Sequence, residues 1–221
     1  MTTQFRDRTE AGQMLAKALS AYANRADVLV LGLPRGGVPV AFEIAKALNA
    51  PLDVFVVRKL GVPEQPELAM GAIASGGMQV LNEDIVRSLT IPSEIVNRVA
   101  EIEQKELKRR ESLYRGDLPA PNYTGRTLIL VDDGLATGAT MRVAVMALQQ
   151  QKPDRIIIAV PIAATETCDR FRAEVDEVFC ISTPKRFSAV GLAYQDFSQT
   201  TDAEVQNLLA KSHASKLTVS H

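Results

Sequence analysis

The stretch LILVDDGLATGAT, residues 128–140, contains the pattern that decides the fold. It begins with four apolar residues, continues with two adjacent aspartates and ends in Thr-Gly-Ala-Thr. A short, continuous apolar run is typical of a strand that is buried on both faces. The stretch therefore predicts a buried strand that ends at Asp132, followed by a turn and by a helix that starts near Gly138.

Four further apolar runs have the same character, and helical patterns lie between most of them. The predicted strands are 28–33, 52–57, 127–132, 155–160 and 177–181. The predicted helices are an opening one at about 9–22, capped by Asp7 or Thr9, and others at 38–49, 138–151 and 165–174. This alternation predicts an α/β fold, namely a doubly wound, mainly parallel five-stranded sheet with helices on both faces.

Two regions interrupt the alternation. Residues 58–78 carry four glycines and two prolines, which predicts a loop too long for an ordinary connection and therefore mobile or functional. Residues 93–115 form a long polar helix pattern closed by Gly116. Its thin apolar stripe, Ile95, Val99 and Ile102, suits packing either on the sheet or on a second subunit.

Composition excludes several classes of protein. The 221 residues are 46% apolar and 23% charged, which suits a soluble globular chain of one domain. No apolar run approaches the roughly 20 residues that cross a bilayer, and the first residues have no secretory pattern, so we expect a cytoplasmic protein without membrane contact. Cys168 and Cys180 have neither metal-ligand nor redox spacing and are expected to be reduced.

The net charge of −1 argues against a nucleic-acid partner, because binding phosphates of nucleic acid needs clustered Lys and Arg. The densest basic run, KELKRR at 105–110, lies among glutamates. Glu101 with Lys105 and Glu106 with Arg110 have the i,i+4 spacing of helical ion pairs. We therefore interpret this run as a solvated helix face.

The acids and the turn behind them predict a site for a phosphorylated sugar. In doubly wound sheets, ligands bind beyond the carboxyl ends of the strands. Asp132 and Asp133 lie at such an end, and two adjacent carboxylates need a cation or hydroxyl donors. After them a helix is predicted to start near Gly138, and the first backbone amides of a helix have no partner within it, so they attract a phosphate. The hydroxyls of Thr137 and Thr140 add two further donors. A ribose 5-phosphate satisfies both halves.

Two other families have a similar strand. A Walker B segment needs a partner loop of the form GxxxxGK[ST], and the sequence contains none. A response-regulator receiver domain needs another Asp at the end of a later strand, and RIIIAVPIAA supplies none. Neither interpretation fits this chain.

VDDGLATGAT resembles the fingerprint of type I phosphoribosyltransferases, which use 5-phosphoribosyl 1-diphosphate (PRPP). The resemblance implies that Asp132 and Asp133 hold the ribose hydroxyls and that the loop cradles the 5-phosphate. The loop residues so implied are Ala136, Thr137, Gly138, Ala139 and Thr140. It also implies a requirement for Mg²⁺, which binds through few carboxylates plus substrate phosphates, here at Asp132 and Asp133.

GLPRGGVPVA, 32–41, follows the first strand and resembles the pyrophosphate loop of the same family. Arg35 adds charge, and Gly36 and Gly37 permit a backbone geometry in which their amides point at pyrophosphate oxygens. In the resembled enzymes a mobile loop follows the next strand and closes over PRPP, which implies catalytic roles for Arg58 and Lys59. Glu67, in this loop, has no assigned role, and a surface charge is the simplest interpretation.

The acceptor is expected to be a purine-like base, whose identity the sequence leaves open. The Arg-Gly-Gly loop resembles xanthine-guanine enzymes, whereas Leu-Ala-Thr-Gly at 135–138 resembles adenine enzymes. The stretch 183–197 loosely resembles the segment of the purine enzymes that stacks on the base, which makes Phe187 and Tyr194 the acceptor-binding candidates. Core packing explains these aromatic rings equally well.

Two function classes follow. The first is a Mg²⁺-dependent phosphoribosyltransferase of nucleotide metabolism, acting on PRPP and a nitrogen base. The second is a PRPP-sensing regulator of the same fold that performs no chemistry. We expect one domain over 1–212, with a core at about 25–182, a small hood from 1–24 and 183–212, and a disordered tail at 213–221. A homodimer built by the helix at 93–115 is expected by analogy.

Overall fold

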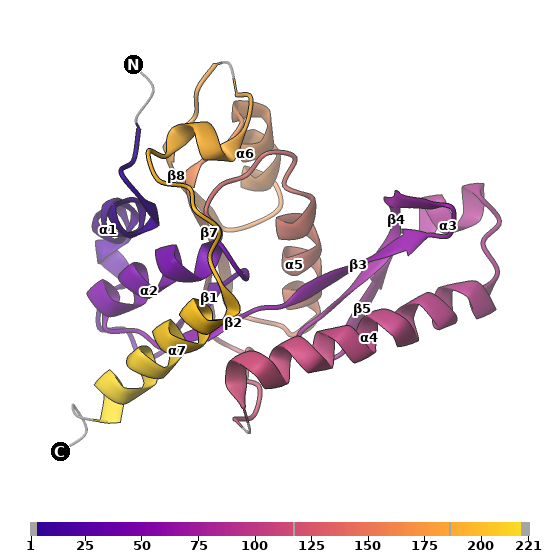
Figure 1. Ribbon diagram of the computed structural model, residues 1–221, viewed down its shortest axis with the longest axis horizontal. Coiled ribbons are helices and arrows are strands. Elements are labelled where there is room, and N and C mark those ends of the chain that lie inside the picture. The colour runs from indigo at the N-terminus through magenta and orange to yellow at the C-terminus, as the bar shows by residue number, and fades with distance from the viewer. Residues whose placement is uncertain (1–3, 117, 186, 218–221) are drawn as a thin grey trace.

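Five parallel strands form the main sheet, as the apolar runs predict. The computed structural model describes residues 4–116, 118–185 and 187–217, without the side chains of Pro66, Glu67 and 215–217 (Figure 1). The strands are β1 (Val28–Gly32), β2 (Leu52–Val54), β6 (Thr127–Val131), β7 (Arg155–Ile162) and β8 (Glu177–Ser182). Their order is β2-β1-β6-β7-β8. The α/β fold with a parallel five-stranded sheet is thus confirmed.

The strand order reverses between β1 and β6. From β1 the chain crosses to β2 on one side of it, whereas β6 lies on its other side and is followed outward by β7 and β8. Gly32 pairs with Val131, so both strands end at the same level. Ligands of doubly wound sheets bind at such a reversal, beyond the carboxyl ends of the strands. The residues after Gly32 and after Val131 therefore line the expected crevice.

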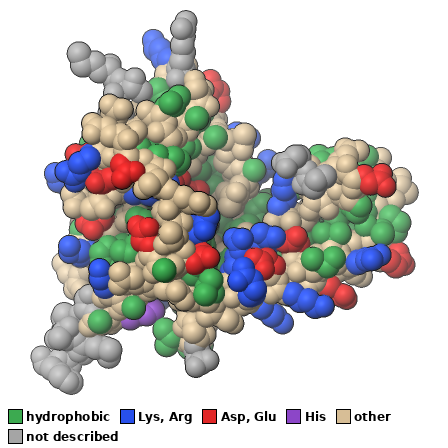
Figure 2. Space-filling model, in the orientation of Figure 1, with side chains coloured by type: hydrophobic (Ala, Val, Ile, Leu, Met, Phe, Trp, Pro, Cys, Tyr) green, Lys and Arg blue, Asp and Glu red, His purple; other side chains and the backbone are tan. Residues whose placement is uncertain are grey.

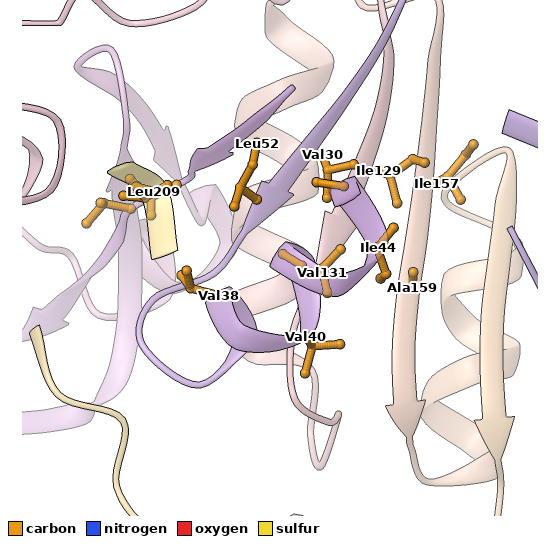
Figure 3. Close-up of a cluster of buried hydrophobic side chains, with 14 of the residues drawn as sticks. Val30, Val38, Val40, Ile44, Leu52, Ile129, Val131, Ile157, Ala159 and Leu209 are labelled. Carbon is orange, nitrogen blue, oxygen red and sulfur yellow. The ribbon is translucent and has the colours of Figure 1, made fainter. Parts of the chain in front are cut away.

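Helices cover both faces of the sheet. The first face carries α1 (Arg8–Ala18), α2 (Gly37–Leu48) and α7 (Asp202–Leu217), and the second carries α5 (Ala139–Gln150) and α6 (Thr165–Arg172). Alternate residues of one strand face opposite sides, so Val30 and Ile129 pack under α2 (Figure 3) while Leu29 and Leu128 pack under α5. Burial on both faces explains why the strands are continuous apolar runs.

The start of α1 is fixed by Asp7. Its carboxylate accepts a hydrogen bond of 2.8 Å from the backbone N–H of Glu10, which lowers the pKa of Asp7. The predicted helix at 9–22 is divided into α1 and a 3₁₀ turn, η1 (Ser20–Tyr22). Because loss of an N-cap costs about 1 kcal/mol, Asp7→Ala is expected to lower the free energy of unfolding by that amount in urea denaturation. Asp169→Ala, which removes an exposed pair with Arg172, is the control and should cost much less.

Residues 57–115 form a lobe that projects from the main sheet (Figure 1). The expectation of a loop over 58–78 is wrong, because this region forms an antiparallel sheet. It contains β3 (Val57–Val62), β4 (Gln65–Ala74) and β5 (Met78–Leu81), followed by α3 (Glu83–Ser88) and α4 (Ser93–Arg115). The side chain of Glu67 lies outside the described residues.

The helix predicted at 93–115 is confirmed as α4, and Gly116 ends it with a φ of +59°. It packs against β3 and β4 through its buried side chains, among them Val96 and Leu107. Ile102, expected in the apolar stripe, is 58% exposed. Glu106 accepts hydrogen bonds from Arg109 and Arg110, and basic and acidic side chains are interspersed along the lobe (Figure 2). This agrees with a solvated face.

The first and last described helices, α1 and α7, lie beside the main sheet. The expectation of a disordered tail from 213 is wrong up to Leu217, because α7 continues to that residue; 218–221 lie outside the described part. Phe5 and Tyr194 form an isolated parallel bridge, so the two segments expected to form a hood touch there. The division into core and hood stays a prediction. Among the described residues, the helices are all too short or too polar to span a bilayer.

Candidate functional site

Two loops meet where β1 and β6 end. The backbone N–H of Leu33 donates to the carbonyl of Val131, at 2.9 Å. A Cβ on Gly37 would lie 2.6 Å from that carbonyl oxygen and 2.9 Å from the Cα of Asp132. A Cβ on Gly36 would lie 2.7 Å from the Cγ of Asp133 and would overlap its Oδ2. The structure therefore brings the Arg-Gly-Gly loop into direct contact with the two acids.

The role expected for the two glycines needs correction. Gly36 has a φ of −61° and a ψ of −30°, which any residue can adopt. The N–H of Gly37 donates to the carbonyl of Leu33, at 3.0 Å, so this amide is used inside the turn. Gly36 and Gly37 matter because they have no Cβ, so the loop can lie against Asp132 and Asp133. Arg35, between them and the strand, is half-buried.

The second loop has the form expected of a phosphate site. Ala136, Thr137, Ala139 and Thr140 are exposed, and Gly138 begins α5 with a φ of +72°. The N–H of Ala139 lies 3.4 Å from the Thr137 hydroxyl oxygen, and the first N–H bonded to the backbone is that of Arg142. In the described part of the chain, the N–H groups of Thr140 and Met141 have no partner. Backbone N–H groups without a partner at the start of a helix favour the binding of an anion.

Two side chains of α6 support this loop. The hydroxyl of Thr167 donates to the carbonyl of Ala136, at 2.8 Å. A Cβ on Gly138 would lie 2.6 Å from the ring of Phe171, so glycine is needed there for packing as well as for its positive φ. Sequence reasoning missed Thr167 and Phe171, because neither has a local signal that separates it from an ordinary helix residue.

The acid pair is shielded from water and has one cationic partner among the described residues. Burial, and then the charge of Asp133, raise the pKa of Asp132 well above its ordinary value. Burial also raises the pKa of Asp133, while Arg8 opposes this rise. Nε of Arg8 donates to Oδ2 of Asp133, at 2.9 Å, and a terminal nitrogen of Arg8 forms an ion-pair contact of 2.8 Å with the same oxygen. The cation that adjacent carboxylates require is thus Arg8, which the sequence did not reveal.

Arg58 and Lys59 lie on β3, at the root of the projecting lobe. Arg58 forms an ion pair of 2.6 Å with Glu103 of α4. Among the described residues, no hydrogen bond or ion pair joins Arg58 to Asp132 or Asp133. Catalytic roles for Arg58 and Lys59 stay predictions.

The two acceptor candidates lie in a different setting from the one expected. Tyr194 is 5% exposed, and its ring contacts Phe5 and Phe197, with centroid distances of 5.5 and 5.1 Å. Its hydroxyl donates to the backbone carbonyl of Asp133, at 2.6 Å. A base cannot stack on a ring so covered, so Tyr194 supports the acid pair instead. Phe187 is half-buried against the same apolar cluster.

No group of three or more His, Cys, Asp or Glu side chains with metal-binding geometry occurs in 4–116, 118–185 and 187–217. Asp132 and Asp133 remain the candidate carboxylates.

Comparison with known proteins gives the context of this geometry. A model of the family described as "Phosphoribosyl transferase domain" matches residues 67–196, which include both acids and the loop behind them. Two curated Mycobacterium tuberculosis proteins, Rv0571c of strain H37Rv and MT0597 of strain CDC 1551, are 48% identical over 209 residues. Their names assign them provisionally to the phosphoribosyl transferases. The match covers 95% of this chain and 47% of theirs, so the chain spans about half their length.

Solved structures also match. The crystal structure of TT1426 from Thermus thermophilus is 42% identical, has a TM-score of 0.85, and matches 95% of this chain and 99% of that one. The structure of AQ2163 from Aquifex aeolicus, 15% identical with a TM-score of 0.51, covers 91% of this chain and 83% of that one. The second likeness shows the fold alone.

Proposed function

The chain belongs to the phosphoribosyl transferase domain family, and from this premise we propose that it transfers the 5-phosphoribosyl group of PRPP to a nitrogen of an acceptor base, releasing pyrophosphate. The observation that carries the proposal is the contact between the two loops. The Arg-Gly-Gly loop after β1 lies directly on Asp132 and Asp133, and the free amides behind them lie at the same end of the sheet, beyond the carboxyl ends of β1 and β6.

Each part of PRPP has a partner in this arrangement. The 5-phosphate binds the free amides of Thr140 and Met141 and the hydroxyls of Thr137 and Thr140, at the start of α5. The ribose hydroxyls donate to the carboxylates of Asp132 and Asp133. Arg35 has no ion-pair partner in the described part of the chain, and its guanidinium supplies positive charge for the pyrophosphate.

The acid pair also fits Mg²⁺. Oδ2 of Asp132 and Oδ1 of Asp133 accept no hydrogen bond from the described residues. Mg²⁺ is commonly held by one or two carboxylates together with substrate phosphates and water, so two such oxygens suffice. Asp132 is the better ligand, because the guanidinium of Arg8 repels a second cation at Asp133. When bound, Mg²⁺ would neutralise charge on the departing pyrophosphate.

The acceptor is a purine-like base in this proposal, since the loop sequences resemble those of purine enzymes. PRPP-dependent pyrophosphate release, measured with a panel of purine and pyrimidine bases, tests it. Release with one or more bases supports the enzyme. Binding of PRPP without release from any base favours the PRPP-sensing regulator. A homodimer and a cytoplasmic location stay predictions.

Asp133→Ala is expected to lower PRPP affinity or turnover by roughly one to two powers of ten. A hydrogen bond to a charged group is worth roughly 1.5–3 kcal/mol, and each 1.4 kcal/mol corresponds to about a factor of ten. Asp154→Ala is the matched control, because this exposed acid precedes β7 at the opposite end of the sheet. PRPP titrations that coincide for Asp133→Ala and the parent would refute the assignment.

A further inference from the structure

The guanidinium of Arg8 is held on three sides. Two of its nitrogens bind Oδ2 of Asp133, and Nη1 donates to the carbonyl of Ser198, at 2.8 Å. Its Cζ lies 4.1 Å from the ring centroid of Phe197, within the range of a cation–π contact. The side chain of Arg8 is 12% exposed, so water competes little for these bonds.

The partners of Arg8 also hold the backbone of Asp133. Phe197 stacks on Tyr194, and the hydroxyl of Tyr194 donates to the carbonyl of Asp133. The contacts therefore form a closed ring. The carboxylate of Asp133 binds Arg8, Arg8 lies over Phe197, Phe197 stacks on Tyr194, and Tyr194 binds the backbone of Asp133. Phe5, which pairs with Tyr194, fixes the N-terminal segment that carries Arg8.

The two carboxylate oxygens of Asp133 consequently differ. Oδ2 accepts a hydrogen bond from Nε of Arg8, contacts a terminal nitrogen of the same guanidinium, and lies against Gly36, where a Cβ would overlap it. Oδ1 accepts no hydrogen bond from the part of the chain that the structure describes. A sugar hydroxyl that donates to Oδ1 therefore breaks no hydrogen bond of the described residues, whereas one that donates to Oδ2 competes with Arg8.

We propose that Arg8 is a positioning residue of the sugar site, which fixes Asp133 so that Oδ1 alone is presented to a ribose hydroxyl. This inference rests on the proposed function, because the ribose is that of PRPP. It assigns Arg8 no contact with PRPP itself.

Calorimetric titration with PRPP and with inorganic pyrophosphate, in the presence of Mg²⁺, tests the inference. Arg8→Gln is expected to weaken PRPP binding by roughly tenfold, the equivalent of one weakened charge-assisted hydrogen bond. Pyrophosphate has no hydroxyl for Asp133, so its affinity should change less than about twofold. Arg8→Lys keeps the charge and one contact and should recover part of the PRPP affinity.

Arg6→Gln is the matched control, because Arg6 is exposed, lies two residues away and carries the same charge. In a double-mutant cycle, Arg8→Gln should have no further effect once Asp133 is replaced by Ala. Phe197→Leu removes the supporting ring without changing any charge, and it decides the question if Arg8→Gln does not fold. Thermal denaturation establishes that each variant is folded.

The outcomes separate the two proposals. If the parent protein does not bind PRPP, the proposed function fails, and this inference fails with it. If the parent binds PRPP but Arg8→Gln and Phe197→Leu bind it equally well, only the inference is overturned. Equal weakening of PRPP and pyrophosphate by Arg8→Gln also overturns it, since that result indicates general attraction of anions.

Discussion

Gly36→Ala is expected to lower PRPP-dependent turnover by about 100-fold or more. The added Cβ would overlap Oδ2 of Asp133 and lie 2.7 Å from its Cγ, so the carboxylate must move by about an ångström. A misplacement of that size in a reacting site can cost about 100-fold in rate. The moved carboxylate also loses its geometry with Arg8. Steady-state kinetics with saturating base measures the effect.

Gly125→Ala provides the control for this substitution. Gly125 has a φ of +68°, so alanine there costs roughly 1–2 kcal/mol through the backbone, but no atom lies within 4 Å of the added Cβ. The control variant should lose stability and keep its turnover. A Gly36→Ala protein that is as active as the parent would show that the Arg-Gly-Gly loop need not lie on Asp133.

Asp53→Ala is expected to lower the free energy of unfolding by about 3 kcal/mol. Nε of Arg115 lies 3.0 Å from both carboxylate oxygens of Asp53, and the side chains of Arg115 and Asp53 are 5% and 12% exposed. Removing one partner of a buried ion pair typically costs about 3–5 kcal/mol, because the other charge stays buried. We expect the lower value, since Arg115 keeps an ion pair with Glu111, at 2.9 Å.

This pair joins the last turn of α4 to β2 and so connects the projecting lobe to the main sheet. Urea denaturation of Asp53→Ala measures its contribution. Replacing both partners, Asp53→Leu together with Arg115→Met, should recover much of the loss, because no charge is then left unpaired. If Asp53→Ala is as stable as the parent, the pair does not hold the lobe in place.

The strands and the acid pair could be predicted because their signals are local. The run 128–131 is apolar throughout because both faces of the strand are covered, and Asp132 marks its end. The lobe could not be predicted from its glycines. Gly76 and Gly77 have φ values of +82° and +75° in the turn between β4 and β5, and the register of β3 shifts at Gly61. These glycines lie at a turn and at a register shift within a sheet, and not in a long loop.

The support of the site could not be predicted, because it depends on contacts between distant segments. Arg8 and Asp133 are separated by 125 positions, and Thr167 reaches Ala136 from 31 positions away. Phe187 and Tyr194 were predicted to bind the acceptor, and the fold shows that the hydroxyl of Tyr194 donates to the backbone carbonyl of Asp133. The sequence pointed to the aromatic residues near 194. Their contacts depend on the fold and could not be predicted from residue type.

A crystal structure of the protein with PRPP and Mg²⁺ tests most directly whether the two loops form one phosphoribose site. We expect the 5-phosphate against the N–H groups of Thr140 and Met141, and a ribose hydroxyl at about 2.5–3.0 Å from Oδ1 of Asp133. Arg8 should stay on Oδ2. PRPP bound away from Asp132 and Asp133, or bound with its phosphate far from the start of α5, would contradict the account.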